Sequence, residues 1–106
     1  MTTDSVFQAL ADPTRRALLL RIAERPRPVK EAGRGFDMSR PAISKHLGVL
    51  EQAGLISFRP DRADARRRVA HAELAALAEV GSYLARLRRF WEGELDDLGD
   101  VLGKME

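Results

Sequence analysis

The last third of the chain carries one unbroken pattern of apolar positions at helical spacing. Intervals of three and four residues alternate through Leu74, Leu77, Gly81, Leu84, Arg88, Trp91, Leu95, Leu98, Leu102 and Met105. This alternation predicts one long helix over residues 73–106. It continues for about four heptads, which is more than a small compact body can cover. The far half of the stripe therefore needs a second copy of the chain, since a large apolar strip would otherwise face water.

We expect a homodimer held chiefly by this C-terminal helix, with the first helix packed alongside. The expected interface residues are Phe7, Leu84, Arg88, Trp91, Leu95, Leu98 and Leu102. The stem of Arg88 can lie along the interface while its guanidinium reaches Glu92 or a carboxylate of the partner. The alternative is that the stripe packs within one chain, which its first half, residues 74–84, is expected to do in part.

Two helices are predicted before residue 25. The first shows helical spacing at Val6, Phe7, Leu10 and Ala11. Asp12 and Pro13 end it and begin the second, because an aspartate accepts hydrogen bonds from free N–H groups and a proline has no N–H to lose there. The second helix is predicted over residues 13–24, with Leu18 and Ile22 buried. Prolines at positions 26 and 28 stop it.

Two further helices are predicted before residue 55. The third covers residues 29–36, although each of its two glycines costs about 0.5–1 kcal/mol relative to alanine in a helix interior. Ser39 is expected to cap the fourth helix, with Pro41 in its first turn and Gly54 as a left-handed C-terminal cap. The buried face of the fourth helix is predicted to hold Ile43, Leu47 and Leu50.

A hairpin follows, with strands at residues 55–59 and 66–70 and a turn between them. Because two strands alone are marginal in water, the hairpin must pack on the helices. The fold class is therefore mainly α with a small β-hairpin, in the order typical of a winged helix-turn-helix with a long C-terminal dimerisation helix. We assign residues 1–106 to one domain. Within it lie a helix-turn-helix at 29–54, a wing at 55–70 and the dimerisation helix at 73–106.

Charge is divided unevenly along the chain. Residues 1–72 hold 14 basic and 8 acidic side chains (+6), and residues 73–106 hold 4 and 8 (−4), which together give the net charge of +2. The predicted wing alone carries five arginines, Arg59 among them, against two aspartates. This division suggests a polyanion-binding surface joined to a part that avoids polyanions. The alternative at this point is a chance distribution over a solvated surface.

Three runs of residues carry a resemblance to a known family. They are FQALADPTRRALLLRIA at residues 7–23, FDMSRPAISKHLGVLEQAGLI at 36–56 and RRFWEGELDDL at 88–98. The chain resembles the ArsR/SmtB family of small bacterial winged-helix transcriptional repressors, and its last run is similar to the branch of that family that lacks metal sites. It departs from the family pattern at Gly48, where relatives often carry a longer polar side chain, and in the two glycines of the third helix.

The resemblance implies a recognition helix that begins at Ser39 and a DNA-contacting wing. The residues that it assigns to DNA binding are Ser39, Arg40, Pro41, Ser44, Lys45, His46, Arg62, Arg66, Arg67 and Arg68. Arg40 can grip a phosphate or pair with guanine, and the wing arginines can follow phosphates or enter a minor groove. The alternatives are a pure helix cap for Ser39, a hydrogen-bonded boundary residue for His46, and a solubilising loop for the wing.

The sequence offers no chemistry for catalysis. It has no cysteine, no glycine-rich phosphate loop and no HExxH or GxSxG pattern. His46 and His71 lie in different elements, and the carboxylates near residues 94–100 are expected to form a solvated face. Metal-sensing relatives use cysteines near the third helix, or Asp and His pairs in the C-terminal helices, and this chain has neither set. We expect no enzymatic activity, no cofactor and no metal site, and the sequence identifies no small-molecule effector.

These features predict a homodimeric repressor that binds double-stranded DNA at an inverted-repeat operator, which could include its own promoter. The alternative is a winged-helix module that binds proteins instead of DNA. Such a module needs no positive wing. The longest apolar stretch near the start covers only residues 17–20, and the N-terminus lacks the regions of a secretory signal. We therefore expect a cytoplasmic protein with no membrane partner.

Overall fold

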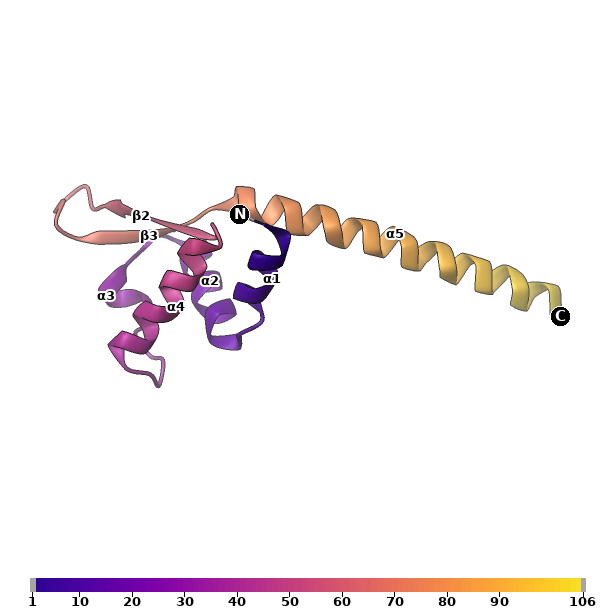
Figure 1. Ribbon diagram of the computed structural model, residues 1–106, viewed down its shortest axis with the longest axis horizontal. Coiled ribbons are helices and arrows are strands. Elements are labelled where there is room, and N and C mark those ends of the chain that lie inside the picture. The colour runs from indigo at the N-terminus through magenta and orange to yellow at the C-terminus, as the bar shows by residue number, and fades with distance from the viewer. Residues whose placement is uncertain (1, 106) are drawn as a thin grey trace.

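The computed structural model of the protein describes the backbone of residues 2–105 and the side chains of residues 2–93. The fold is mainly helical with a small sheet, as predicted (Figure 1). Its helices are α1 (Thr3–Leu10), α2 (Pro13–Glu24), α3 (Val29–Ala32), α4 (Arg40–Gln52) and α5 (Leu74–Met105). Its strands are β1 (Arg27–Pro28), β2 (Ile56–Pro60) and β3 (Arg68–Ala72).

Local capping groups explain where the helices begin. The side chain of Asp12 accepts hydrogen bonds from the backbone N–H groups of Thr14 (2.8 Å) and Arg15 (3.1 Å) at the start of α2. The bond from Arg15 is the largest of the causes that lower the pKa of Asp12 from its ordinary value. Ser39 caps α4 by accepting from the N–H of Ala42 at 3.3 Å. The predicted starts of α2 and α4 are therefore confirmed.

The sheet differs from the predicted hairpin in two ways. Its strands pair antiparallel in the order β1-β3-β2, and the two-residue strand β1, which was not predicted, pairs Arg27 with Ala70. The strands of the wing lie one to two residues later than the predicted ranges 55–59 and 66–70. The loop between the two strands, residues 61–67, is one residue longer than predicted. Two backbone hydrogen bonds close it, from the N–H of Asp61 to the carbonyl oxygen of Arg67 and from the N–H of Arg67 to that of Asp64. The hairpin packs on α2 and α4, as expected.

One apolar core lies between the helices and the sheet. The predicted core residues Leu18, Ile22, Leu47 and Leu50 are each at most 1% exposed, and Ile43 is also buried. In α1 the buried residues are Val6 and Ala9, whereas Ala11, the last position of the predicted helical spacing, lies exposed after the helix has ended. No polar side chain in the described part of the chain is fully buried. The core therefore has no buried polar network.

The third helix ends at Ala32, four residues earlier than predicted, and its two glycines explain why. Gly35 has a φ of +88°, in the left-handed region that favours glycine. Gly33 lies so close to α4 that a Cβ there would be 2.8 Å from Cγ1 and Cγ2 of Ile43. The glycines were predicted only to weaken a helix. In the structure they turn the chain and let α3 approach α4.

Replacing Gly33 with alanine is expected to lower the free energy of unfolding by about 1–3 kcal/mol, because overpacking forces neighbouring side chains out of position. Gly48→Ala in α4 is the matched control, since a Cβ there meets nothing within 4 Å. Helix propensity predicts that this control gains about 0.5–1 kcal/mol. Denaturant-induced unfolding measures both variants. A Gly33→Ala protein as stable as the parent would contradict the packing role.

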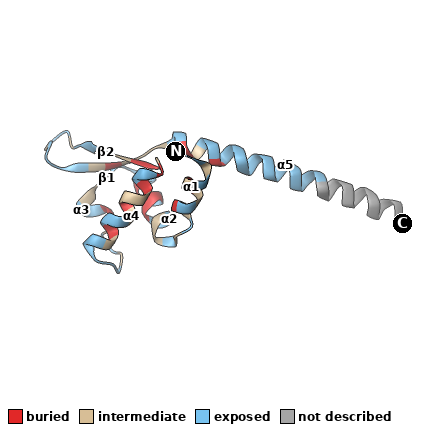
Figure 2. Cartoon of the chain, viewed as in Figure 1, coloured by how far each residue is buried: buried red, intermediate tan, exposed pale blue. Residues whose placement is uncertain are grey.

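The long helix α5 leaves the body after its first turns and spans about 48 Å at 1.5 Å per residue (Figure 1). Ala76 and Val80 of α5 are buried against the core, and Tyr83 packs edge-to-face on Phe7 with ring centroids 5.5 Å apart. Within the first half of the predicted stripe, Leu77 packs against the core as expected, whereas Leu74 is 70% exposed. The core meets α5 along a line of smaller residues beside the leucines. Beyond that point the described surface of α5 is exposed (Figure 2).

Candidate nucleic-acid interface

The helix α4 separates a buried face from a polar one. Its apolar residues enter the core. The predicted contacts Ser39, Arg40, Pro41, Ser44 and Lys45 are all exposed. The predicted cap role of Ser39 is confirmed, and its hydroxyl lies at the N-terminus of α4, where backbone N–H groups favour a phosphate. The first two turns of α4 thus present two cations and two hydroxyl groups to solvent.

His46 lies at the margin of the buried face and is half-buried. Its Nδ1 is 3.3 Å from Nη1 of Arg15. Because a guanidinium can only donate hydrogen bonds, Nδ1 is the acceptor if this contact is a hydrogen bond. The Arg15 guanidinium also donates to the carbonyl oxygens of Ala9 (2.7 Å) and Gln8 (3.1 Å). His46 therefore lies where the alternative interpretation places it, at the boundary of the buried face, and a direct DNA contact by His46 stays a prediction.

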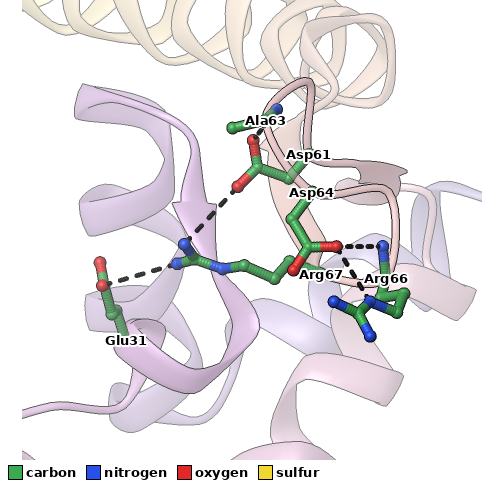
Figure 3. Close-up of polar contacts among 6 residues, drawn as sticks. All are labelled: Glu31, Asp61, Ala63, Asp64, Arg66 and Arg67. Atoms are coloured by element: carbon green, nitrogen blue, oxygen red, sulfur yellow. Dashed lines mark hydrogen bonds and ion pairs between the residues drawn. The ribbon is translucent and has the colours of Figure 1, made fainter.

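The wing arginines fall into different environments. Arg62 is exposed and makes no ion pair with any described residue, and Arg66 pairs only with the nearby Asp64 while its side chain stays 93% exposed. Arg68 lies over the ring of Phe58 at 4.2 Å from the centroid. Figure 3 shows the Arg67 guanidinium between two carboxylates, Asp61 of the loop and Glu31 of α3. The wing is thus a partly neutralised loop and not five equivalent cations.

Arg59, which also counts toward the positive charge of the wing, points to the start of α5. Its guanidinium lies 3.0 Å from the carboxylate of Glu73. Glu73 also accepts a hydrogen bond from the hydroxyl of Ser57, and this bond is the main cause that lowers the pKa of its carboxyl. Arg59 therefore ties β2 to the residue that precedes α5, and the charge that the wing offers to a ligand is smaller than its composition indicates.

Sequence reasoning missed the residues that hold these side chains in place: Arg15, Glu31, Phe58 and Asp61. Each acts across a distance in the chain, as Glu31 does on Arg67, so neither spacing nor composition points to the contact. For Arg15 the sequence did hold one signal. The run DPTRR at residues 12–16 places Arg15 in the first turn of α2, next to the end of α1 whose carbonyl oxygens it contacts.

The predicted dimer residues Leu84, Arg88 and Trp91 lie on an exposed face of α5. Leu84 is 51% and Trp91 is 61% exposed. Arg88 pairs with Glu92 at 3.1 Å, as predicted. Phe7 is half-buried against Tyr83 of its own chain, so α1 packs beside α5 within one chain, and the predicted place of Phe7 in the dimer interface stays a prediction. Leu95, Leu98 and Leu102 lie outside the residues whose side chains are described.

Sequence reasoning missed two residues of this face. Leu87 and Phe90 are exposed beside the predicted ones, and Phe90 is 68% exposed. They were missed because the prediction followed one series of positions, 84, 88 and 91, at alternating intervals of three and four residues. Leu87 and Phe90 each lie one residue before a position of that series.

Two further observations concern the described residues as a group. Among residues 2–93 no cluster of three or more His, Asp or Glu side chains is arranged to hold a metal ion. No helix within that part of the chain combines the length and apolarity needed to cross a bilayer. The groups that remain for recognition are the polar face of α4, the wing and the apolar face of α5.

A short helix, a turn, a second helix capped at its exposed end and a β-hairpin define a winged helix-turn-helix protein. A family model described as a helix-turn-helix domain matches residues 10–57. The HTH-type transcriptional regulator Rv2034 of Mycobacterium tuberculosis is 43% identical over 99 residues, which cover 93% of this chain and 87% of the relative. The solved structure of an ArsR family transcriptional regulator, RHA00566, has a TM-score of 0.74 and 38% identity, and covers 84% of this chain and 94% of its own.

The transcriptional repressor SdpR of Bacillus subtilis is 39% identical over 54 residues, which cover 51% of this chain and 60% of the relative. The chain belongs to the ArsR family of winged helix-turn-helix transcriptional regulators. It is a DNA-binding regulator and not an enzyme, as the sequence predicted. This membership favours DNA binding over the alternative of a protein-binding module.

Proposed function

We propose that the protein is a homodimeric repressor that binds an inverted-repeat operator, and that its own promoter contains one such site. The observation that carries the proposal is the exposed polar face of α4, where Arg40 and Lys45 stand beside the capping hydroxyl of Ser39. Repression is supported by the similarity to the repressor SdpR. Because its ligand is chromosomal DNA, we place the protein in the cytoplasm.

The apolar face of α5 supports the dimer. At about 100° per residue, the exposed side chains of Leu84, Leu87, Phe90 and Trp91 lie within an arc of about 120°. The buried residues Ala76 and Val80 lie in the same arc. The face that the core covers at the start of α5 thus continues, uncovered, past the edge of the body. A second α5 in a two-fold arrangement would cover it, and residues 95, 98 and 102 extend the same sequence pattern.

Two-fold symmetry sets the form of the operator. A dimer presents two copies of α4 related by a two-fold axis, so its half-sites should be inverted and about one helical turn, 34–36 Å, apart or a multiple of that. A genome-wide binding footprint is expected to return such an inverted repeat, with one instance at the promoter of the protein's own gene. Direct repeats or single half-sites in the footprint would contradict the proposal.

Substitutions in α4 test the assigned roles. Arg40→Ala and Lys45→Ala are each expected to weaken operator binding by about 1–3 kcal/mol, with the larger loss of base specificity for whichever side chain meets a base edge. Both residues are exposed, so thermal unfolding should be unchanged. Gln52→Ala, at the exposed far end of the same helix, is the matched control. Fluorescence anisotropy against operator and scrambled duplexes measures all three, and equal binding by all would remove α4 from the interface.

A further inference from the structure

The wing loop, residues 61–67, is ordered by its own backbone and by two aspartates. The N–H of Asp61 donates to the carbonyl oxygen of Arg67, and the N–H of Arg67 donates to that of Asp64, both at 2.9 Å. The carboxylate of Asp61 accepts from the N–H of Ala63 at 3.0 Å, and that of Asp64 accepts from the N–H of Arg66 at 3.1 Å. These bonds give the loop a fixed internal shape. They do not fix its direction relative to the helices.

A cleft of about 330 Å³ separates the loop from the start of α3. It is lined by Pro28, Val29 and Lys30 on one side and by Asp64, Arg66, Arg67 and Arg68 on the other. Among the ion pairs and hydrogen bonds of the described residues, one joins this loop to a helix: Nη2 of Arg67 lies 3.8 Å from Oε1 of Glu31. The other end of the same guanidinium lies 3.7 Å from Oδ2 of Asp61 (Figure 3).

The position of Arg67 argues against a phosphate contact. Its side chain is about half exposed, and its planar guanidinium faces two carboxylates that come from different elements. A phosphate would have to displace both. Arg62 and Arg66, in contrast, are exposed, and among the described residues neither forms an ion pair with a helix. The wing therefore divides into one inward-facing arginine and two outward-facing ones.

We propose that Arg67 is a positioning residue, which holds the wing loop against α3 through Glu31 and Asp61 so that Arg62 and Arg66 meet the DNA backbone in a fixed orientation. This inference rests on the proposed DNA-binding function. An exposed ion pair adds little to folding stability. Its effect here is on binding, because a loop that is already oriented loses less conformational freedom when it meets DNA.

The variant Glu31→Gln distinguishes a positioning role from a simple effect of surface charge, because the two predict opposite changes in the affinity for DNA. If Glu31 were only an acid near DNA, its removal would raise the affinity for DNA. If Glu31 holds Arg67, its removal should lower operator affinity by about threefold to tenfold. In an Arg67→Gln background the same change should have no further weakening effect, since the pair is already broken. Glu51→Gln is the matched control, an exposed glutamate on α4 with no ion pair among the described residues, and its affinity should stay equal or rise.

A second measurement tests the loop without DNA. Backbone amide order parameters of residues 62–66 in the free protein are expected to fall in Glu31→Gln and Arg67→Gln and to match the parent in Glu51→Gln. If the parent binds no duplex, the proposed function fails, whereas this measurement still decides the role of Arg67. Unchanged order parameters in both variants, or a rise in operator affinity with Glu31→Gln, would overturn the proposal.

Discussion

Raising the salt concentration from 50 to 200 mM is expected to weaken operator binding by about 10³- to 10⁵-fold. Proteins that bind 6–10 phosphates show about this reduction, because each neutralised phosphate releases a counterion that added salt drives back. Arg40, Lys45, Arg62 and Arg66 are exposed, and the two copies in a dimer bring about eight candidate cations, within that range. The plot of log K against log salt concentration, from anisotropy titrations, measures the effect.

Substitutions show which cations contribute to that slope. Arg62→Gln and Arg66→Gln should each flatten the slope by about 0.9 for every phosphate that is no longer neutralised, and a dimer carries each substitution twice. Arg89→Gln is the control, because Arg89 belongs to the helix α5, which extends away from α4 and the wing (Figure 1). A parent protein whose affinity hardly changes over this salt range would contradict DNA binding through phosphates altogether.

The parts of the fold that the sequence predicts correctly depend on local chemistry. Asp12 beside Pro13 sets the start of α2, and Ser39 sets the start of α4. Gly54, which follows the end of α4, has a φ of +77°, as expected for a left-handed C-terminal cap. In each case the decisive hydrogen bond or backbone angle involves residues within a few positions, so the sequence alone contains the information.

The parts that it predicts wrongly depend on contacts between distant residues. The strand β1 exists only because Arg27 and Pro28 pair with β3, about forty residues later. Gly33 ends α3 beside a side chain of α4 that no local pattern indicates. The segment Pro26-Arg27-Pro28 gives no strand signal by itself. Such elements follow from the tertiary fold, which composition and periodicity do not encode.

The sequence predicts which residues make up the candidate site, but only partly how they are arranged. Spacing identified the exposed face of α4, because helical periodicity separates it from the core. Counting charge in the wing treated its arginines as alike, although Arg67 and Arg59 face carboxylates of other elements. Ion pairs between segments are set by three-dimensional proximity. For that reason, only the structure shows which arginines pair with carboxylates of other elements and which are exposed.

Trp91→Ala is expected to convert the protein from dimer to monomer at micromolar concentration. Truncating a tryptophan at a well-packed site costs about 3–5 kcal/mol, and a loss of that size raises the dimer dissociation constant by about 10²- to 10⁴-fold. Trp91 is 61% exposed in the single chain and lies on the same face of α5 as Leu84 and Leu87. If this face is the interface, the tryptophan is buried only in the dimer, so the variant monomer should fold as well as the parent.

Sedimentation velocity measures the change, and DNA binding gives a second readout. The loss of the dimer should weaken binding to the inverted repeat far more than binding to an isolated half-site, because the two copies of α4 no longer bind as one unit. Leu74→Ala is the matched control: Leu74 is 70% exposed on the same helix, but at about 100° per residue it lies about 80° from Leu84, outside the apolar arc. A parent that sediments as a monomer would overturn the dimer and the inverted repeat together, whereas a Leu74→Ala monomer would place the interface on a different face of α5.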